Sequence, residues 1–109
     1  MSGEAEVEEL PAELTLELEP QIEFKGGRYD ALHLREPKVI EVRQAESHLR
    51  GNFGPEQLRK YQIALIAKVA NVPEPVAEAL PISKLNAAWK YLRGFIEPSQ
   101  ETGSSSSGS

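Results

Sequence analysis

Few residues of this 109-residue chain are of the types that bind metals or act as nucleophiles, and they are poorly placed for either task. Glu41 precedes the histidine His48 by seven residues and could share one helix face with it, but two ligands are fewer than a zinc site needs. Ser47 adjoins His48, and neighbouring residues on a helix do not face each other. We therefore interpret His48 and the second histidine, His33, as solvated surface residues.

No nucleotide-binding or hydrolase motif of known mechanism occurs in the sequence. The Gly26-Gly27 pair lacks the third glycine and the following helix of a phosphate-binding loop, so it predicts a hairpin turn. Ser83 is better explained as the N-cap of a helix than as a nucleophile. The sequence predicts no catalytic residues, no metal and no cofactor, and we expect that the protein is not an enzyme.

Charge is unevenly distributed along the chain, which has a net charge of −5. Residues 1–21 contain seven Glu and no Lys or Arg, whereas the rest of the chain has ten acids and twelve bases. Nucleic-acid binding would require a basic stripe over much of one face, so we expect no nucleic-acid partner.

Cysteine is absent, which excludes disulfides and thiolate metal sites. No apolar run approaches the roughly 20 residues that span a bilayer, and the N-terminus is acidic, unlike that of a signal peptide. We expect a soluble protein of the cytoplasm with no membrane partner.

Composition divides the chain into three parts. Residues 1–11 form an acidic arm with little to bury, which we expect to be disordered. Residues 98–109 are rich in Ser and Gly and predict a flexible tail or an expression scar. Residues 12–97 are expected to form one folded domain.

Residues 14–24 alternate strictly between apolar and polar side chains, which predicts a half-buried strand, interrupted at Pro20. After the turn, residues 29–34 predict a second strand. A two-residue Gly-Gly loop would place Leu32 and Leu34 on the acidic face. A three-residue loop with a bulge pairs Ile22 with Leu32, and we favour it because it gathers the aliphatic residues on one face.

The rest of the domain has helical periodicity. Val39, Val42, Ala45 and Leu49 repeat on one stripe of a first helix that ends near Gly51. A second helix, residues 55–70, has the broadest apolar arc and should be the most buried. A short turn follows at 75–80, and a last helix begins near Pro81. These elements predict an α+β fold, an N-terminal β-hairpin followed by a small bundle of three to four helices.

Six side chains are candidates for contact with a partner or with a second copy. Tyr91 lies toward the edge of the apolar face of the last helix and is expected to be exposed, and Tyr and Trp contribute strongly to interfaces. The free edge of the first strand invites strand addition. The candidates, each assigned as partner-binding, are Leu14, Leu16, Leu18, Trp89, Tyr91 and Phe95.

Several segments together resemble the tail assembly chaperones of contractile-tailed, Mu-like and P2-like bacteriophages, the family of P2 tail protein E. Residues 14–29 resemble the opening strand and Gly-Gly turn of that family, and residues 32–37 (LHLREP) are similar to its most recognisable segment. The resemblance continues through residues 63–67, Val72-Pro73, Leu80-Pro81-Ile82 and Gly94-Phe95-Ile96, and it covers about residues 12–97.

This resemblance implies a non-catalytic protein that binds the tape measure protein, keeps it soluble and helps to recruit tail tube subunits in the cytoplasm of the bacterial host, without entering the mature virion. It supplies no catalytic residues. The alternatives are a structural or accessory component of the tail, a stand-alone interaction module and a small helical DNA-binding regulator.

Overall fold

The computed structural model describes residues 10–51 and 54–97, so the predicted tail and most of the predicted acidic arm lie outside the described residues. An antiparallel hairpin, β1 (Glu13–Phe24) and β2 (Gly27–Arg35), comes first. A short α1 (Val39–Ala45) continues into one 3-10 turn, η3 (Glu46–Leu49). The helices α2 (Pro55–Ala70), α3 (Glu74–Glu78) and α4 (Ile82–Ile96) follow. The predicted α+β fold, a hairpin followed by helices, is confirmed for this part of the chain.

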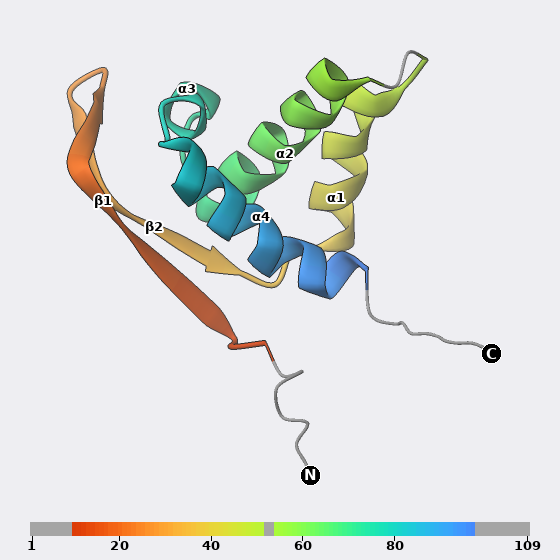
Figure 1. Ribbon diagram of the computed structural model, residues 1–109, viewed down its shortest axis with the longest axis horizontal. Helices are drawn as coiled ribbons and strands as arrows, with labels where there is room; N and C mark the ends of the chain where they lie inside the picture. Colours follow the sequence, from red (N-terminus) through yellow and green to blue (C-terminus); the bar gives the residue numbers. More distant parts are fainter. Residues whose placement is uncertain (1–9, 52–53, 98–109) are drawn as a thin grey trace, which may run out of the picture.

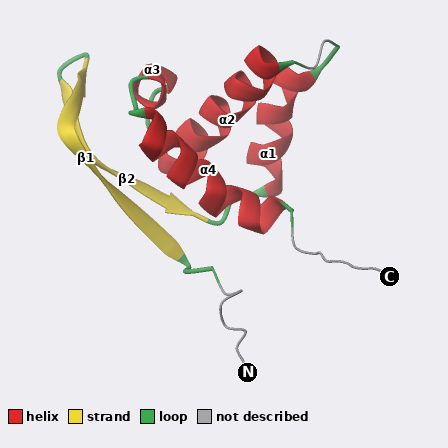
Figure 2. Cartoon of the chain, viewed as in Figure 1, coloured by secondary structure: helices red, strands yellow, loops and turns green. Residues whose placement is uncertain are grey.

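The hairpin is a long twisted ribbon, and all four α-helices lie on one side of it (Figures 1 and 2). The helix α2 is the centre of this arrangement, because it contacts α1, η3, α3, α4 and β2. Seven of its 16 residues are buried, against four of 15 in α4, which confirms that α2 is the most buried helix. The hairpin contributes Leu18, Leu32 and Leu34 to the same core. A two-stranded sheet is marginal in water by itself, so these three leucines attach it to the helices.

The hairpin register differs from the predicted one. The loop has two residues, Lys25 and Gly26, because Phe24 pairs with Gly27 and Ile22 with Tyr29. A shift in β1 between Glu17 and Ile22 then resets the pairing.

Beyond this shift Leu16 lies opposite Leu32 and Leu14 opposite Leu34. The irregular stretch contains Pro20, which has no N–H group to donate to a ladder and which follows a cis peptide bond. The aliphatic residues therefore share a face, as the sequence predicts, but through extra residues around Pro20 and not through a longer loop.

Two helix details also differ from expectation. Val39 was predicted to lie on the buried stripe of the first helix, but it is 76% exposed at the N-terminus of α1, whereas Ala45 is fully buried. Ser83 was predicted to cap α4, but this helix begins at Ile82 after Pro81, without a side-chain cap. The helix α2 ends at Ala70, as predicted. Its end is capped by Asn71, which has a left-handed φ of 59°, and the Val72 N–H donates to the Ala67 carbonyl at 3.0 Å.

Replacing Gly26 by Ala should destabilise the protein by about 1 kcal/mol. Lys25 and Gly26 have φ angles of 49° and 82°, which is the backbone of a type I′ hairpin turn. A Cβ at Gly26 would meet no atom within 4 Å, so the cost comes from the backbone conformation alone. Urea unfolding measures the change. Lys25→Asn is the control, because Asn tolerates a left-handed φ and should leave stability equal or raised. Equal stability of Gly26→Ala and wild type would contradict this account of the turn.

Candidate partner-binding surfaces

The histidines are not brought together with other reactive groups. His33 is exposed on β2, and its Nδ1 lies 3.3 Å from Thr15 Oγ1. His48 is half-buried in η3 beside the exposed Ser47. Within residues 10–51 and 54–97, no group of three or more His, Asp or Glu side chains could hold a metal ion. None of the helices in that same part of the chain has both the length and the apolar content needed to cross a membrane.

Glu41 has a structural partner in place of His48. Arg35, the last residue of β2, donates from both terminal nitrogens to the carboxylate of Glu41 in the first turn of α1, at 3.0 and 2.7 Å. The same carboxylate accepts the Lys38 N–H at 2.8 Å, which satisfies one free donor at the start of α1. These hydrogen bonds and the positive charge of Arg35 hold the pKa of Glu41 below its usual range. The Leu-Arg-Glu-Pro segment therefore fixes the hairpin to the first helix.

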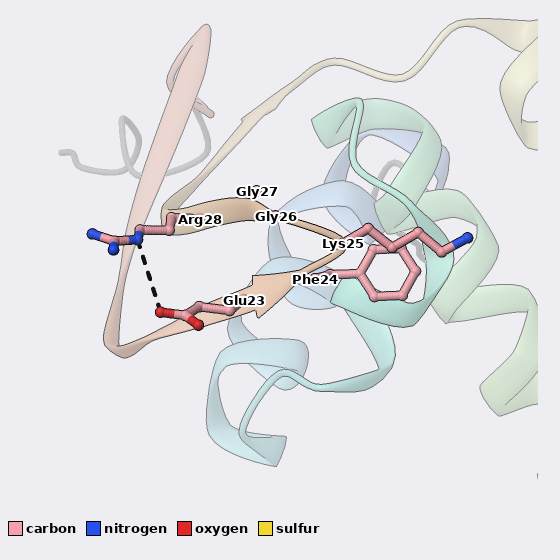
Figure 3. A pocket seen from close by; sticks show the side chains of 6 residues that line it. All are labelled: Glu23, Phe24, Lys25, Gly26, Gly27 and Arg28. Carbon is pink, nitrogen blue, oxygen red and sulfur yellow. Dashed lines mark ion pairs between the residues drawn. The ribbon is translucent and has the colours of Figure 1, made fainter.

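The hairpin tip projects charged and aromatic side chains (Figure 3). Arg28 Nε lies 3.8 Å from Glu23 Oε2 across the two strands, and both side chains are more than two-thirds exposed. The Lys25 ammonium lies 5.5 Å from the centre of the Phe24 ring. Solvent-exposed pairs of this kind contribute little to stability. The tip is a polar end of the ribbon, and its groups converge on no reactive centre.

The structure separates the six predicted partner-binding residues into two groups. Leu18 is 3% exposed and Tyr91 is 6% exposed, so the expectation that Tyr91 is exposed is wrong. The Tyr91 hydroxyl donates to the Pro11 carbonyl at 2.6 Å, and burial raises the pKa of Tyr91. This bond holds the residues before β1 against α4. The other four are half-buried and packed against the core: Leu14, Leu16, Trp89 and Phe95.

The two half-buried aromatic side chains make edge-to-face contacts. Trp89 packs against Tyr61 of α2 with ring centres 5.5 Å apart, and Phe95 packs against Tyr91 with ring centres 5.2 Å apart. The Trp89–Tyr61 contact therefore joins α4 to α2, whereas the Phe95–Tyr91 contact is an i, i+4 pair within α4, and both Trp89 and Phe95 leave part of their surface in solvent. The sequence correctly placed both on the apolar face of the last helix.

The most exposed large apolar side chains in the described part of the chain were not predicted as partner contacts. They are Val39 at 76%, Ile82 at 60% and Ile40 at 52%. All three lie in the first turn of a helix, where helical spacing alone cannot distinguish a buried from an exposed position. The sequence did contain one indication of this exposure. Val39 and Ile40 are adjacent, and adjacent residues on a helix point in different directions, so a single buried stripe cannot cover both side chains equally.

An open apolar groove adjoins Val39, between α1 and the C-terminal turn of α4. Pro37, Val39, Val42, Phe95 and Ile96 supply its apolar walls. Its rim is charged, with Glu36, Arg43 and Glu46. Exposed apolar surface with a polar rim is a common feature of interaction sites. This groove with its charged rim is therefore suited to binding another protein chain.

In the described residues, a hairpin packs on four helices, one apolar groove is open to solvent, and no metal-ligand cluster is present. These features define a small α+β protein with surfaces suited to binding another chain. The sequence model of the family described as phage tail assembly chaperone proteins, E, or 41 or 14, matches residues 13–97. The chain belongs to this phage tail assembly chaperone family. No curated protein and no solved structure matches the chain.

Proposed function

We propose that the protein binds the tape measure protein during assembly of a phage tail, keeps it soluble and helps to recruit tail tube subunits. It does so without catalysing a reaction, in the cytoplasm of the bacterial host, and it is absent from the mature virion. The observation that carries this proposal is the family match over residues 13–97, which spans every helix and strand described.

The surface chemistry supports a role in binding. A chaperone for an apolar helical client needs accessible apolar side chains next to charges that keep the complex in solution. Val39 and Ile40 supply accessible apolar side chains, and Arg43 and Glu46 are charged residues beside them. The net charge of −5 favours the solubility of the complex.

The six residues predicted from the sequence keep a place in this proposal. Leu14, Leu16, Trp89 and Phe95 have surface in solvent and could touch the client or a second copy. Leu18 and Tyr91 are buried, so they would support this surface from beneath. Strand addition at β1 is also part of the proposal, because its second edge has no partner strand in the described part of the chain.

Co-expression with this protein should raise the soluble fraction of the tape measure protein of the same phage several-fold, and the two should co-purify. The physical reason is that covered apolar helices no longer associate with one another. Densitometry of soluble and pelleted fractions measures the effect, with an unrelated acidic protein of similar size as the control. An unchanged soluble fraction and no co-purification would reject the proposed function.

The composition of purified virions distinguishes this proposal from a structural role. An assembly factor should be undetectable by mass spectrometry of virions but present in lysates of infected cells. A stoichiometric amount in the virion would indicate a tail component instead.

A further inference from the structure

One face of α1 combines an exposed isoleucine with cations that form no ion pair within the described part of the chain. Ile40, Arg43, Gln44 and Ser47 follow one another at helical spacing, and all four are exposed. Arg50, which follows η3, and Lys68 of α2 complete the lining of an open hollow at this face. We call these six residues the α1 face.

The α1 face is basic within a chain that is acidic overall. Three of its six residues are cations, and none is an acid. Among the described residues, no carboxylate lies within 4.0 Å of the charged nitrogens of Arg43, Arg50 or Lys68, whereas Arg28, Arg35 and Lys60 each have such a partner. Cations near a helix C-terminus are favourable for the helix itself, but this does not account for the isoleucine that stands beside them at 52% exposure.

The geometry suits a helix more than an extended segment. From Ile40 in α1 to Ser47 in the adjoining η3 turn, the stripe spans two turns, about 10 Å along the axis. A second helix laid against it would present side chains at the same i, i+3, i+4 and i+7 spacing. An apolar side chain would cover Ile40, and carboxylates would meet Arg43, Arg50 and Lys68.

We propose that the α1 face is the docking site for an amphipathic, acidic helix of a tail protein that this chaperone accompanies. This inference rests on the proposed function and specifies the chemistry of the partner segment. Charge complementarity favours an acidic protein segment over nucleic acid, because only three cations gather here and β1 is lined by Glu13, Glu17, Glu19 and Glu23.

The test uses overlapping synthetic peptides of about 20 residues that cover the tape measure and tail tube proteins of the same phage. Fluorescence anisotropy measures their binding to the full chain. Peptides that combine an apolar stripe with two or more carboxylates should bind best, and binding should weaken as the salt concentration rises. Ile40→Asp and Arg43→Glu should each weaken binding by roughly tenfold or more.

Matched controls separate binding from folding. Ile82 is exposed in the first turn of α4 as Ile40 is in that of α1, so Ile82→Asp is the control for Ile40→Asp. Arg59 is exposed on α2 and does not line the α1 face, so Arg59→Glu is the control for Arg43→Glu. Both controls should bind within about twofold of wild type, because surface changes outside a contact cost little. A peptide with one Glu changed to Lys should regain affinity for Arg43→Glu, which a merely structural effect would not produce.

Several results would overturn the inference. If the full-length tape measure protein binds wild type and Ile40→Asp equally, the α1 face is not the docking site, although the proposed function stands. If the wild-type protein binds no tail protein, the proposed function is rejected, and the docking-site inference that rests on it is rejected as well. Tighter binding of a 20-base-pair DNA duplex than of any peptide would show that the cations serve nucleic acid. Self-association in sedimentation that is lost in Arg43→Glu would show that a second copy occupies the face.

Discussion

Replacing Leu32 by Ala should lower the free energy of unfolding by about 3 kcal/mol, within the range of 2.7–5 kcal/mol known for buried leucines. Leu32 is 0% exposed, lies opposite Leu16 in the hairpin, and belongs to the core cluster that attaches the hairpin to the helices. Its truncation removes apolar contacts and leaves a cavity in the core between the hairpin and the helices. Urea unfolding followed by circular dichroism measures the change.

Val39→Ala is the control for this experiment. The sequence places Val39 on a buried stripe, but its side chain is 76% exposed, so the change should stay within about 0.5 kcal/mol. Small domains of this size have free energies of unfolding of about 5–15 kcal/mol, and Leu32→Ala could therefore leave too little folded protein for an accurate fit. Leu32→Val then gives a smaller loss of about 1 kcal/mol that remains measurable. Equal effects of Leu32→Ala and Val39→Ala would contradict the packing described here.

Replacing Glu41 by Ala should cost about 1–2 kcal/mol, the second-largest effect expected from a single change. The substitution leaves the Arg35 guanidinium and the Lys38 N–H without their acceptor. The Glu41 side chain is 14% exposed, but that of Arg35 is 38% exposed, so solvent compensates for part of the loss. A loss below about 0.5 kcal/mol at neutral pH would show that the ion pair is an ordinary surface pair. Arg28→Ala is the matched control, because its pair with Glu23 is far more exposed and should contribute almost nothing.

The same carboxylate makes stability depend on pH in a defined direction. Arg35 and Lys38 lower the pKa of Glu41 in the folded state. Because the pKa of Glu41 is lower in the folded state, the ionised carboxylate stabilises the protein fully at pH values above its unfolded-state pKa of about 4.3. This stabilisation is lost as the pH falls through the folded-state pKa of Glu41. The difference in free energy of unfolding between wild type and Glu41→Gln should be constant from about pH 6 to 8 and should shrink below about pH 4.3. A difference that grows on acidification would contradict the assignment.

Local patterns in the sequence predicted the elements and their order. The alternation of residues 14–24, the Gly-containing turn and the prolines at positions 37, 55, 75 and 81 mark the strands and the helix starts, because period and backbone restriction act over a few residues. The breadth of the apolar arc on residues 55–70 predicted that α2 is the most buried helix, and it is. The segment LHLREP and its neighbours supported the family that the match over residues 13–97 establishes.

Which side chains face solvent was decided by the tertiary structure. Val39 and Ala45 lie on the same predicted apolar stripe, yet Val39 is exposed and Ala45 is buried, because Val42 and Ala45 reach the core and the first turn of α1 does not. Tyr91 looked like an edge residue, but the segment before β1 returns over α4 and its Pro11 carbonyl accepts the tyrosine hydroxyl, a contact eighty residues apart in sequence. The hairpin register likewise depended on the irregular stretch around Pro20. Periodicity says which residues share a face of an element; where that face lies depends on contacts between residues far apart in sequence.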